Sequence, residues 1–229
     1  MGSTAASVRA DARQAMNDAI ADAAKRQLAE VGAPGLSVRA VAREVGMASS
    51  AIYRYVKSRD ELLTMLIVNG YNELGEAVEA ADRAVADRKD LGARFRSICR
   101  AIRRWANENP HLYALLYGSP VPGYVAPALT VGPATRVTLA LAALLVESPQ
   151  AVREVTSSTG GSGLEVDALA TYLPGVSEEA ARRGVVVWVE IFGLVSFELF
   201  GHLVGSVADA EQFFERSLDD MAERIGLLG

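Results

Sequence analysis

The sequence is poor in the residue types that build disulfide frameworks, metal centres and hydrolytic sites. It holds one cysteine, Cys99, and two histidines, His111 and His202. A single cysteine excludes an internal disulfide framework and suits a reducing compartment, and its place in an amphipathic helical pattern predicts a buried thiol. No metal-ligand cluster, nucleophile elbow or dinucleotide fingerprint accompanies the histidines. We therefore expect no enzyme, no cofactor and no metal.

Runs of alternating polar and apolar residues, typical of strands, are also scarce, while half of the residues are apolar. This combination predicts an all-α protein. The first residues lack the apolar core of a signal peptide. The most apolar run, Val185 to Val204, is interrupted by Glu190, Glu198 and His202, which favours a buried helix over a membrane span. We expect a cytoplasmic protein with no membrane partner.

Charge is unevenly distributed along the chain. The formal net charge is −5, which argues against nucleic-acid binding by the whole surface. Residues 1–70 nevertheless carry nine Lys/Arg and seven Asp/Glu, and residues 37–59 carry five basic residues and one acidic residue. Positive charge is thus concentrated in one short stretch near the N-terminus.

That stretch, residues 36–63, has the pattern of a helix, a tight turn and a second short helix. Ser37 is a helix N-cap candidate, and Gly46 can leave the helix with a positive φ. Between them, the expected apolar face consists of Val38, Val41, Ala42 and Val45. The second helix is expected over about 48–56, with Ala48, Ala51, Ile52 and Tyr55 inward and Ser49, Ser50, Tyr53 and Arg54 outward. This is the helix-turn-helix pattern, at about 36–56, and its outward face suits the major groove.

The segment SVRAVAREVGMASSAIYRYVKSRDELL resembles the DNA-binding segment of the TetR family of bacterial transcription regulators. The matched positions are Ser37, Val41, Ala42, Val45, Gly46, Ile52, Tyr53, Tyr55, Lys57, Ser58, Arg59 and Leu62. Two positions depart from the pattern: Ala48 stands where a capping Ser is common, and Val56 where Phe is common. The first departure weakens the cap of the recognition helix.

The resemblance implies roles for nine residues at a double-stranded DNA operator. Arg39 is the candidate for a bidentate contact to guanine, and Ser49, Ser50 and Arg54 are candidates for base edges or a thymine methyl. The positions that match phosphate-contacting or positioning sites are Ser37, Tyr53, Tyr55, Lys57 and Arg59. For Tyr55 a simple packing role is as plausible, given its inward phase. Arg9 and Arg13, near the start of the first helix, either reach phosphates or are merely solvated.

We expect a disordered N-terminus over 1–8, a DNA-binding domain over 9–70 and a larger helical ligand-binding and dimerisation domain over 71–229. The larger domain contains a proline-rich crossing between Pro110 and Pro133 and a flexible loop at about 157–163. Its segments NPHLYALLYGSPVPGYVAP and WVEIFGLVSFELFGHL resemble a TetR subgroup with a Trp- and Gly-containing C-terminal domain. A long helix capped by Ser177, running to about Val204, and a final helix over 208–227 are expected to leave apolar surface exposed, so they are the candidate homodimer interface.

Aromatic residues of the larger domain are candidates for an apolar effector pocket, although most large aromatics simply pack. The five predicted ligand contacts are Trp105, Tyr113, Tyr117, Trp188 and Phe192. The family mechanism implied is repression at a palindromic operator, released by a small, largely apolar effector. A helical interaction module that has lost specific DNA binding is the alternative. Activation instead of repression also stays open, because it depends on where the operator lies.

Overall fold

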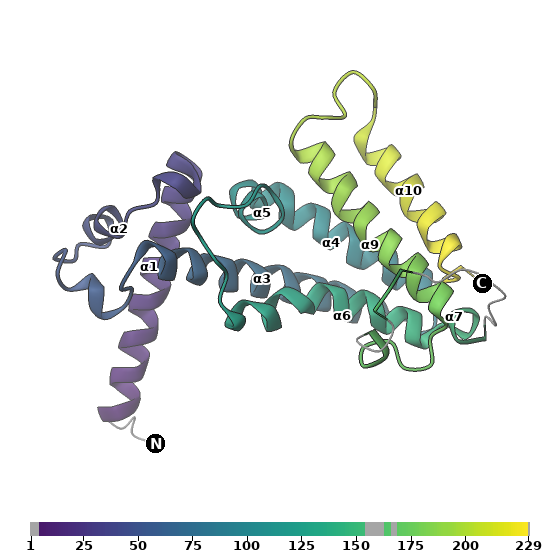
Figure 1. Cartoon of the computed structure of the whole chain (residues 1–229), viewed down its shortest axis with the longest axis horizontal. Coiled ribbons are helices and arrows are strands. Elements are labelled where there is room, and N and C mark those ends of the chain that lie inside the picture. Colours follow the sequence, from purple (N-terminus) through teal and green to yellow (C-terminus); the bar gives the residue numbers. More distant parts are fainter. Residues whose placement is uncertain (1–4, 154–162, 166–168, 229) are drawn as a thin grey trace. The chain divides into compact units, whose positions relative to one another are not determined.

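The computed structural model describes residues 5–153, 163–165 and 169–228, and all regular structure in these residues is helical (Figure 1). Residues 1–4 of the predicted disordered N-terminus and 157–162 of the predicted flexible loop lie outside them. The chain divides into two compact units, residues 1–70 with 111–131, and residues 71–110 with 132–229. The fold class predicted from the sequence is confirmed. The segment 111–131, which we expected in the larger domain, instead packs with the first unit.

The first unit is built on α1, the first part of α3 and four short helical pieces. Its elements are α1 (Ala5–Gly35), α2 (Val38–Glu44), the 3₁₀ turn η1 (Ile52–Arg54), the first part of α3 (Arg59–Arg83), α5 (Pro110–Tyr117) and η2 (Ala128–Thr130). Ile20, Val41, Ile52 and Leu62 are fully buried, one from each of α1, α2, η1 and α3. These four side chains form a small shared core, which fixes the turn between α2 and η1 against α1.

Helix α1 begins earlier than expected and bends before its end. Residues 5–8, which we expected to be disordered, are helical. The sequence pattern missed them because residues 8–15 are exposed and show no apolar face. Gly32 has φ 68° and ψ 173°, outside the helical region, so it interrupts the helix.

The segment that returns to the first unit is held against α3. The hydroxyls of Thr64 on α3 and Tyr124 are hydrogen-bonded at 2.9 Å. A Cβ atom at Gly70 would lie 3.3 Å from Leu116 Cδ1, so α3 and α5 approach closely there. These contacts explain why the proline-rich crossing belongs to the smaller unit.

The second unit is a helical bundle in which α4 is the central contact. It contains the second part of α3, α4 (Leu91–Glu108), α6 (Val131–Glu147), α7 (Pro149–Arg153), α9 (Glu178–Leu199) and α10 (Ala210–Arg224). One face of α4 is buried: Phe95, Ile98, Cys99, Ile102 and Trp105. Cys99 is fully buried, as predicted, and burial raises the pKa of its thiol well above the ordinary value.

Arginines of α4 tie this bundle together. Arg96, Arg100 and Arg103 form ion pairs with Asp219, Glu215 and Glu211 of α10, so the two helices are antiparallel along a ladder of charge pairs. Arg103 also pairs with Glu198 of α9 at 2.7 Å, and its guanidinium lies 5.0 Å from the Phe214 ring centroid.

Arg94 is the most buried of these cations, with 3% of its surface exposed. Its guanidinium donates to Asp82 on α3 at 2.8 and 3.3 Å and to the Arg88 carbonyl at 3.2 Å. It also donates two hydrogen bonds to Glu147 at the end of α6, the longer of them at 3.1 Å. All five of its N–H donors are thus used. These bonds join α3, α4 and α6.

Among the described residues, the segment 128–147 has the length of a membrane span and a mean hydropathy of 1.7. Of its most apolar window, 22% is buried inside the structure. It contains Arg136, which donates to Glu79 at 2.8 and 2.9 Å and to the Asn72 carbonyl at 3.0 Å. An ion-paired arginine within the span, and the cavity described below, identify α6 as a helix of the bundle.

Candidate DNA-binding surface and ligand cavity

The turn after α2 has the geometry that the sequence predicted. Ser37 Oγ accepts from the Ala40 N–H at 3.4 Å, and the Ser37 N–H donates to Gln27 Oε1 at 2.7 Å. Gly46 has φ 71°, and the Met47 N–H donates to the Ala42 carbonyl at 2.8 Å, which closes a Schellman motif. Ser37 therefore caps α2 and is hydrogen-bonded to Gln27 of α1.

The recognition segment differs from the predicted helix over 48–56. Residues 49–51 form a turn, and only Ile52–Arg54 is helical, as a 3₁₀ turn. The bonds run from Ala51 N–H to the Ala48 carbonyl at 2.8 Å and from Arg54 N–H to the Ala51 carbonyl at 3.2 Å, both spanning three residues. The physical reason is the missing cap, because Ala48 has no side-chain oxygen to accept from the first free N–H groups.

The outward face of this segment is nevertheless exposed as predicted. Ser49, Ser50, Tyr53 and Arg54 are exposed, and Ile52 beneath them is fully buried. The prediction was wrong for Ala48, which is exposed. The turn therefore presents two small hydroxyls, a phenol and a guanidinium to solvent.

Positive charge on this surface is not neutralised within the described part of the chain. Arg39, Arg43, Arg54 and Lys57 are exposed, and none of them forms an ion pair with a described carboxylate. The nearby Glu44 is paired with Arg26 at 2.5 Å. Four cations without a described acidic partner, in and near the recognition segment, form a surface suited to binding a polyanion.

Two of the predicted contacts have partners inside the unit. Arg59 Nη2 donates to the Ala33 carbonyl at 2.8 Å, so this arginine holds α3 against the bend at the end of α1. Tyr55 is half-buried, and the Arg13 guanidinium lies 5.7 Å from its ring centroid. Arg13 thus covers the Tyr55 ring, at a place beside the recognition turn.

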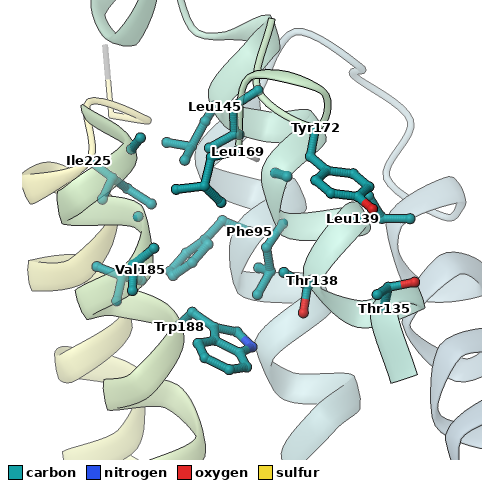
Figure 2. Close-up of a pocket in the computed structure, with 16 residues that line it drawn as sticks. Phe95, Thr135, Thr138, Leu139, Leu145, Leu169, Tyr172, Val185, Trp188 and Ile225 are labelled. Carbon is teal, nitrogen blue, oxygen red and sulfur yellow. The ribbon is translucent and has the colours of Figure 1, made fainter. Parts of the chain in front are cut away.

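The second unit contains a cavity of about 290 Å³ between α4, α6, α9 and the residues around 169–173 (Figure 2). None of the described residues that line it carries a charged side chain. It is formed by Phe95, Thr135, Thr138, Leu139, Leu141, Ala142, Leu145, Leu169, Tyr172, Leu173, Ala181, Gly184, Val185, Val187, Trp188 and Ile225. An apolar cavity with a few hydroxyls is the usual form of a small-molecule site.

Of the five predicted ligand contacts, only Trp188 lines this cavity. Trp105 and Phe192 are buried elsewhere in the same unit, and Phe192 packs edge-on against Trp188 with centroids 6.0 Å apart. Tyr113 and Tyr117 belong to the first unit, where their rings lie 5.2 Å apart.

Most residues of the cavity were not predicted from the sequence, because all five predicted ligand contacts are aromatic. The wall consists mainly of aliphatic side chains, which in a sequence are indistinguishable from ordinary core. Gly184, inside a long helix, was the one available signal, since a glycine there often marks a close approach.

Comparison with known proteins bears on both units. Residues 20–66 match the family model described as bacterial regulatory proteins, tetR family, and residues 95–221 match the tetracyclin repressor-like C-terminal domain. The chain belongs to the TetR family. The helix-turn-helix of the first unit is therefore the DNA-binding element of a TetR-family transcriptional regulator.

Relatives of this TetR-family protein support the same conclusion. The HTH-type transcriptional regulators Rv1816 of Mycobacterium tuberculosis and Mb1846 of Mycobacterium bovis are 42% identical over 200 residues, which are 84% of this chain and 84% of theirs. The crystal structure of SCO4313 is similar with a TM-score of 0.77 and 29% identity, over 93% of this chain and 98% of that one. The regulator PfmR from Thermus thermophilus shares the fold, with a TM-score of 0.55 and 20% identity, over 89% of this chain and 97% of its own.

Proposed function

We propose that this regulator is a homodimeric repressor that binds a palindromic operator and releases it when a small, largely apolar effector occupies the cavity. The observation that carries the proposal is the unpaired positive surface around the helix-turn-helix. Arg39, Arg54 and Lys57 are exposed there without a described acidic partner. Arginine is the residue best suited to guanine in the major groove, and lysine to phosphate. We assign Arg39 to base reading, with Ser49, Ser50 and Arg54 as further base contacts.

The proposed dimer uses the exposed apolar faces of α9 and α10. Four large apolar residues recur at helical spacing along α9 and just past its end: Val186, Val189, Phe197 and Phe200. Each of these residues is between 39% and 58% exposed. Phe213 of α10, 41% exposed, lines the same shallow groove as Phe197. Large apolar side chains in a continuous stripe favour burial against a second copy, as a bundle of two helices from each subunit. Two subunits would present two recognition turns to two half-sites.

The proposed release follows from linkage between the two ligands. An effector that prefers a conformation with misplaced recognition segments lowers DNA affinity, and DNA lowers effector affinity by the same factor. The assignment to the subgroup with a Trp- and Gly-containing C-terminal domain is also a proposal, supported by the WVEIFGLVSFELFGHL segment that forms most of α9.

The test is a selection of bound fragments from genomic DNA by the purified protein, followed by measurement of affinity at several salt concentrations. Enrichment of one short palindrome is expected, with affinity falling steeply as salt rises. The same operator then serves to screen for compounds that release the protein. Its position relative to the promoter decides between repression and activation.

A specific observation favours the alternative of an interaction module. The recognition segment is a 3₁₀ turn without a side-chain cap, so it is less regular than a reading helix. If the selection enriches no sequence and binding is weak and purely salt-dependent, this alternative replaces the repressor.

A further inference from the structure

The cavity of the second unit carries information about the charge of what it binds. The sixteen lining residues that belong to the described part of the chain include no Asp, Glu, Lys, Arg or His. Moving a carboxylate or an ammonium group from water into such a site, with no partner of opposite charge, costs much more than moving a neutral polar group. The lining therefore selects against ionised ligands.

The polar atoms of the lining are gathered on one side. In Figure 2, Thr135, Thr138 and Tyr172 lie to the right, while Leu145, Leu169, Val185 and Ile225 form a hydrocarbon wall to the left. The Trp188 side chain lies below, with its ring nitrogen toward the same right-hand side. A ligand with a hydrocarbon body and one polar end matches this division.

These polar atoms also have bonding capacity left. Thr135 Oγ1 donates to the Gly132 carbonyl at 2.8 Å, so it is available only as an acceptor. The Thr138 and Tyr172 hydroxyls and the Trp188 N–H have no hydrogen-bond partner among the described residues. Tyr172 and Trp188 are 51% and 37% exposed, which places them at the open side of the cavity. A hydroxyl group can accept from the Thr138, Tyr172 or Trp188 donors and donate to Thr135, and a carbonyl group can accept from the same donors, in both cases without carrying charge.

The opposite end of the cavity is shaped by one glycine. A Cβ atom at Gly184 of α9 would lie 2.5 Å from Leu145 Cδ1, and both residues line the cavity. Any other residue at this position would displace the end of the Leu145 side chain and add its own atoms to the wall. Gly184 therefore keeps space open at the hydrocarbon end.

We propose, resting on the regulator function above, that the effector is an uncharged molecule with a hydrocarbon body and a single hydroxyl or carbonyl end group. The polar end faces Thr138, Tyr172 and Trp188, and Gly184 with Leu145 limits the size of the hydrocarbon end. A volume of about 290 Å³ is near the lower limit for small-molecule sites, so the effector is small.

Three probes of eight carbons each test the charge selection: 1-octanol, octanoate and octylammonium. Binding is measured by calorimetry on the full-length protein at pH 7 without DNA. The alcohol is expected to bind at least tenfold more tightly than either ion. Tighter or equal binding of an ion, or no binding of the alcohol up to its solubility, overturns the proposal.

The variant Gly184→Ala tests the size limit. The change favours the helix by about 1 kcal/mol in propensity, so folding is preserved while the cavity narrows. We expect octanol to bind at least fivefold more weakly. Gly132→Ala is the matched control, because a Cβ at Gly132 meets nothing within 4 Å and the residue does not line the cavity. An unchanged octanol affinity in Gly184→Ala, or an equal loss in Gly132→Ala, contradicts the assignment.

Failure of this inference and failure of the regulator function give different results. A protein that selects an operator but binds octanoate best refutes only the neutral effector. A protein that binds octanol in this cavity but selects no DNA sequence refutes only the repressor.

Discussion

Replacing Arg94 with methionine should lower the free energy of unfolding by about 3 kcal/mol, because it breaks a buried ion-pair network. Arg94 is 3% exposed and makes bonds to Asp82, Glu147 and the Arg88 carbonyl. Removal of one partner of a buried pair typically costs about 3–5 kcal/mol. The lower end applies here, since Asp82 keeps its bond to Arg88 at 2.6 Å and 48% of the Glu147 side chain is open to water.

The assay is urea unfolding followed by circular dichroism, at fixed protein concentration because assembly would shift the apparent stability. Arg94→Lys should lose less than Arg94→Met, since it keeps the charge but not the forked geometry. The matched control is Arg182→Met. Arg182 also forms a two-bond pair, with Glu179 at 2.7 and 2.9 Å, but 43% of its side chain is exposed. The control should change stability by less than about 1 kcal/mol. Equal effects in the two methionine variants would refute the argument from burial.

Three further predictions follow from the same structure. Arg39→Ala should weaken operator binding by about 1–3 kcal/mol and relax preference at one symmetric base position, and a uniform loss across operator variants would reassign Arg39 to phosphate. Phe197→Glu should convert the proposed dimer to a monomer in sedimentation, and a variant that stays dimeric excludes this face as the interface. Acid should destabilise the protein: the Arg136 hydrogen bond lowers the pKa of Glu79, and bonds from Arg94 and Arg88 outweigh burial to lower the pKa of Asp82. The stabilisation from these two carboxylates is complete above their ordinary pKa values, 4.5 for Glu79 and 3.8 for Asp82, and is lost as pH falls through the lowered native pKa values. Urea unfolding across pH 2–6 would reveal or contradict this loss.

Helix boundaries were predicted well wherever a cap or a breaker marks them. Ser37 and Ser177 accept the backbone N–H bonds expected of N-caps, and α9 begins directly after Ser177, as predicted. The end of α9 was missed: the helix stops at Leu199, and Gly201 has φ 78°, a local break that the apolar pattern toward Val204 concealed.

The candidate DNA surface was predicted more completely than the cavity. Exposure of Arg39, Ser49, Ser50, Tyr53, Arg54 and Lys57 follows from helical phase and a shared motif, which act over a few residues. The roles of Ser37 and Arg59 did not follow, because their partners Gln27 and Ala33 lie ten and twenty-six residues away.

By itself the sequence determined the helical class, the family and the glycine turn after α2, because periodicity, caps and glycine turns are local properties that a single chain displays directly. Only the tertiary structure decided which helices enclose a cavity and what its wall contains. Phe95, Leu145 and Gly184 are far apart in the chain and ordinary in type, and they become a binding site only where α4, α6 and α9 meet. The same reason explains why the segment around Tyr124 joins the smaller unit, since its contact with Thr64 spans sixty residues.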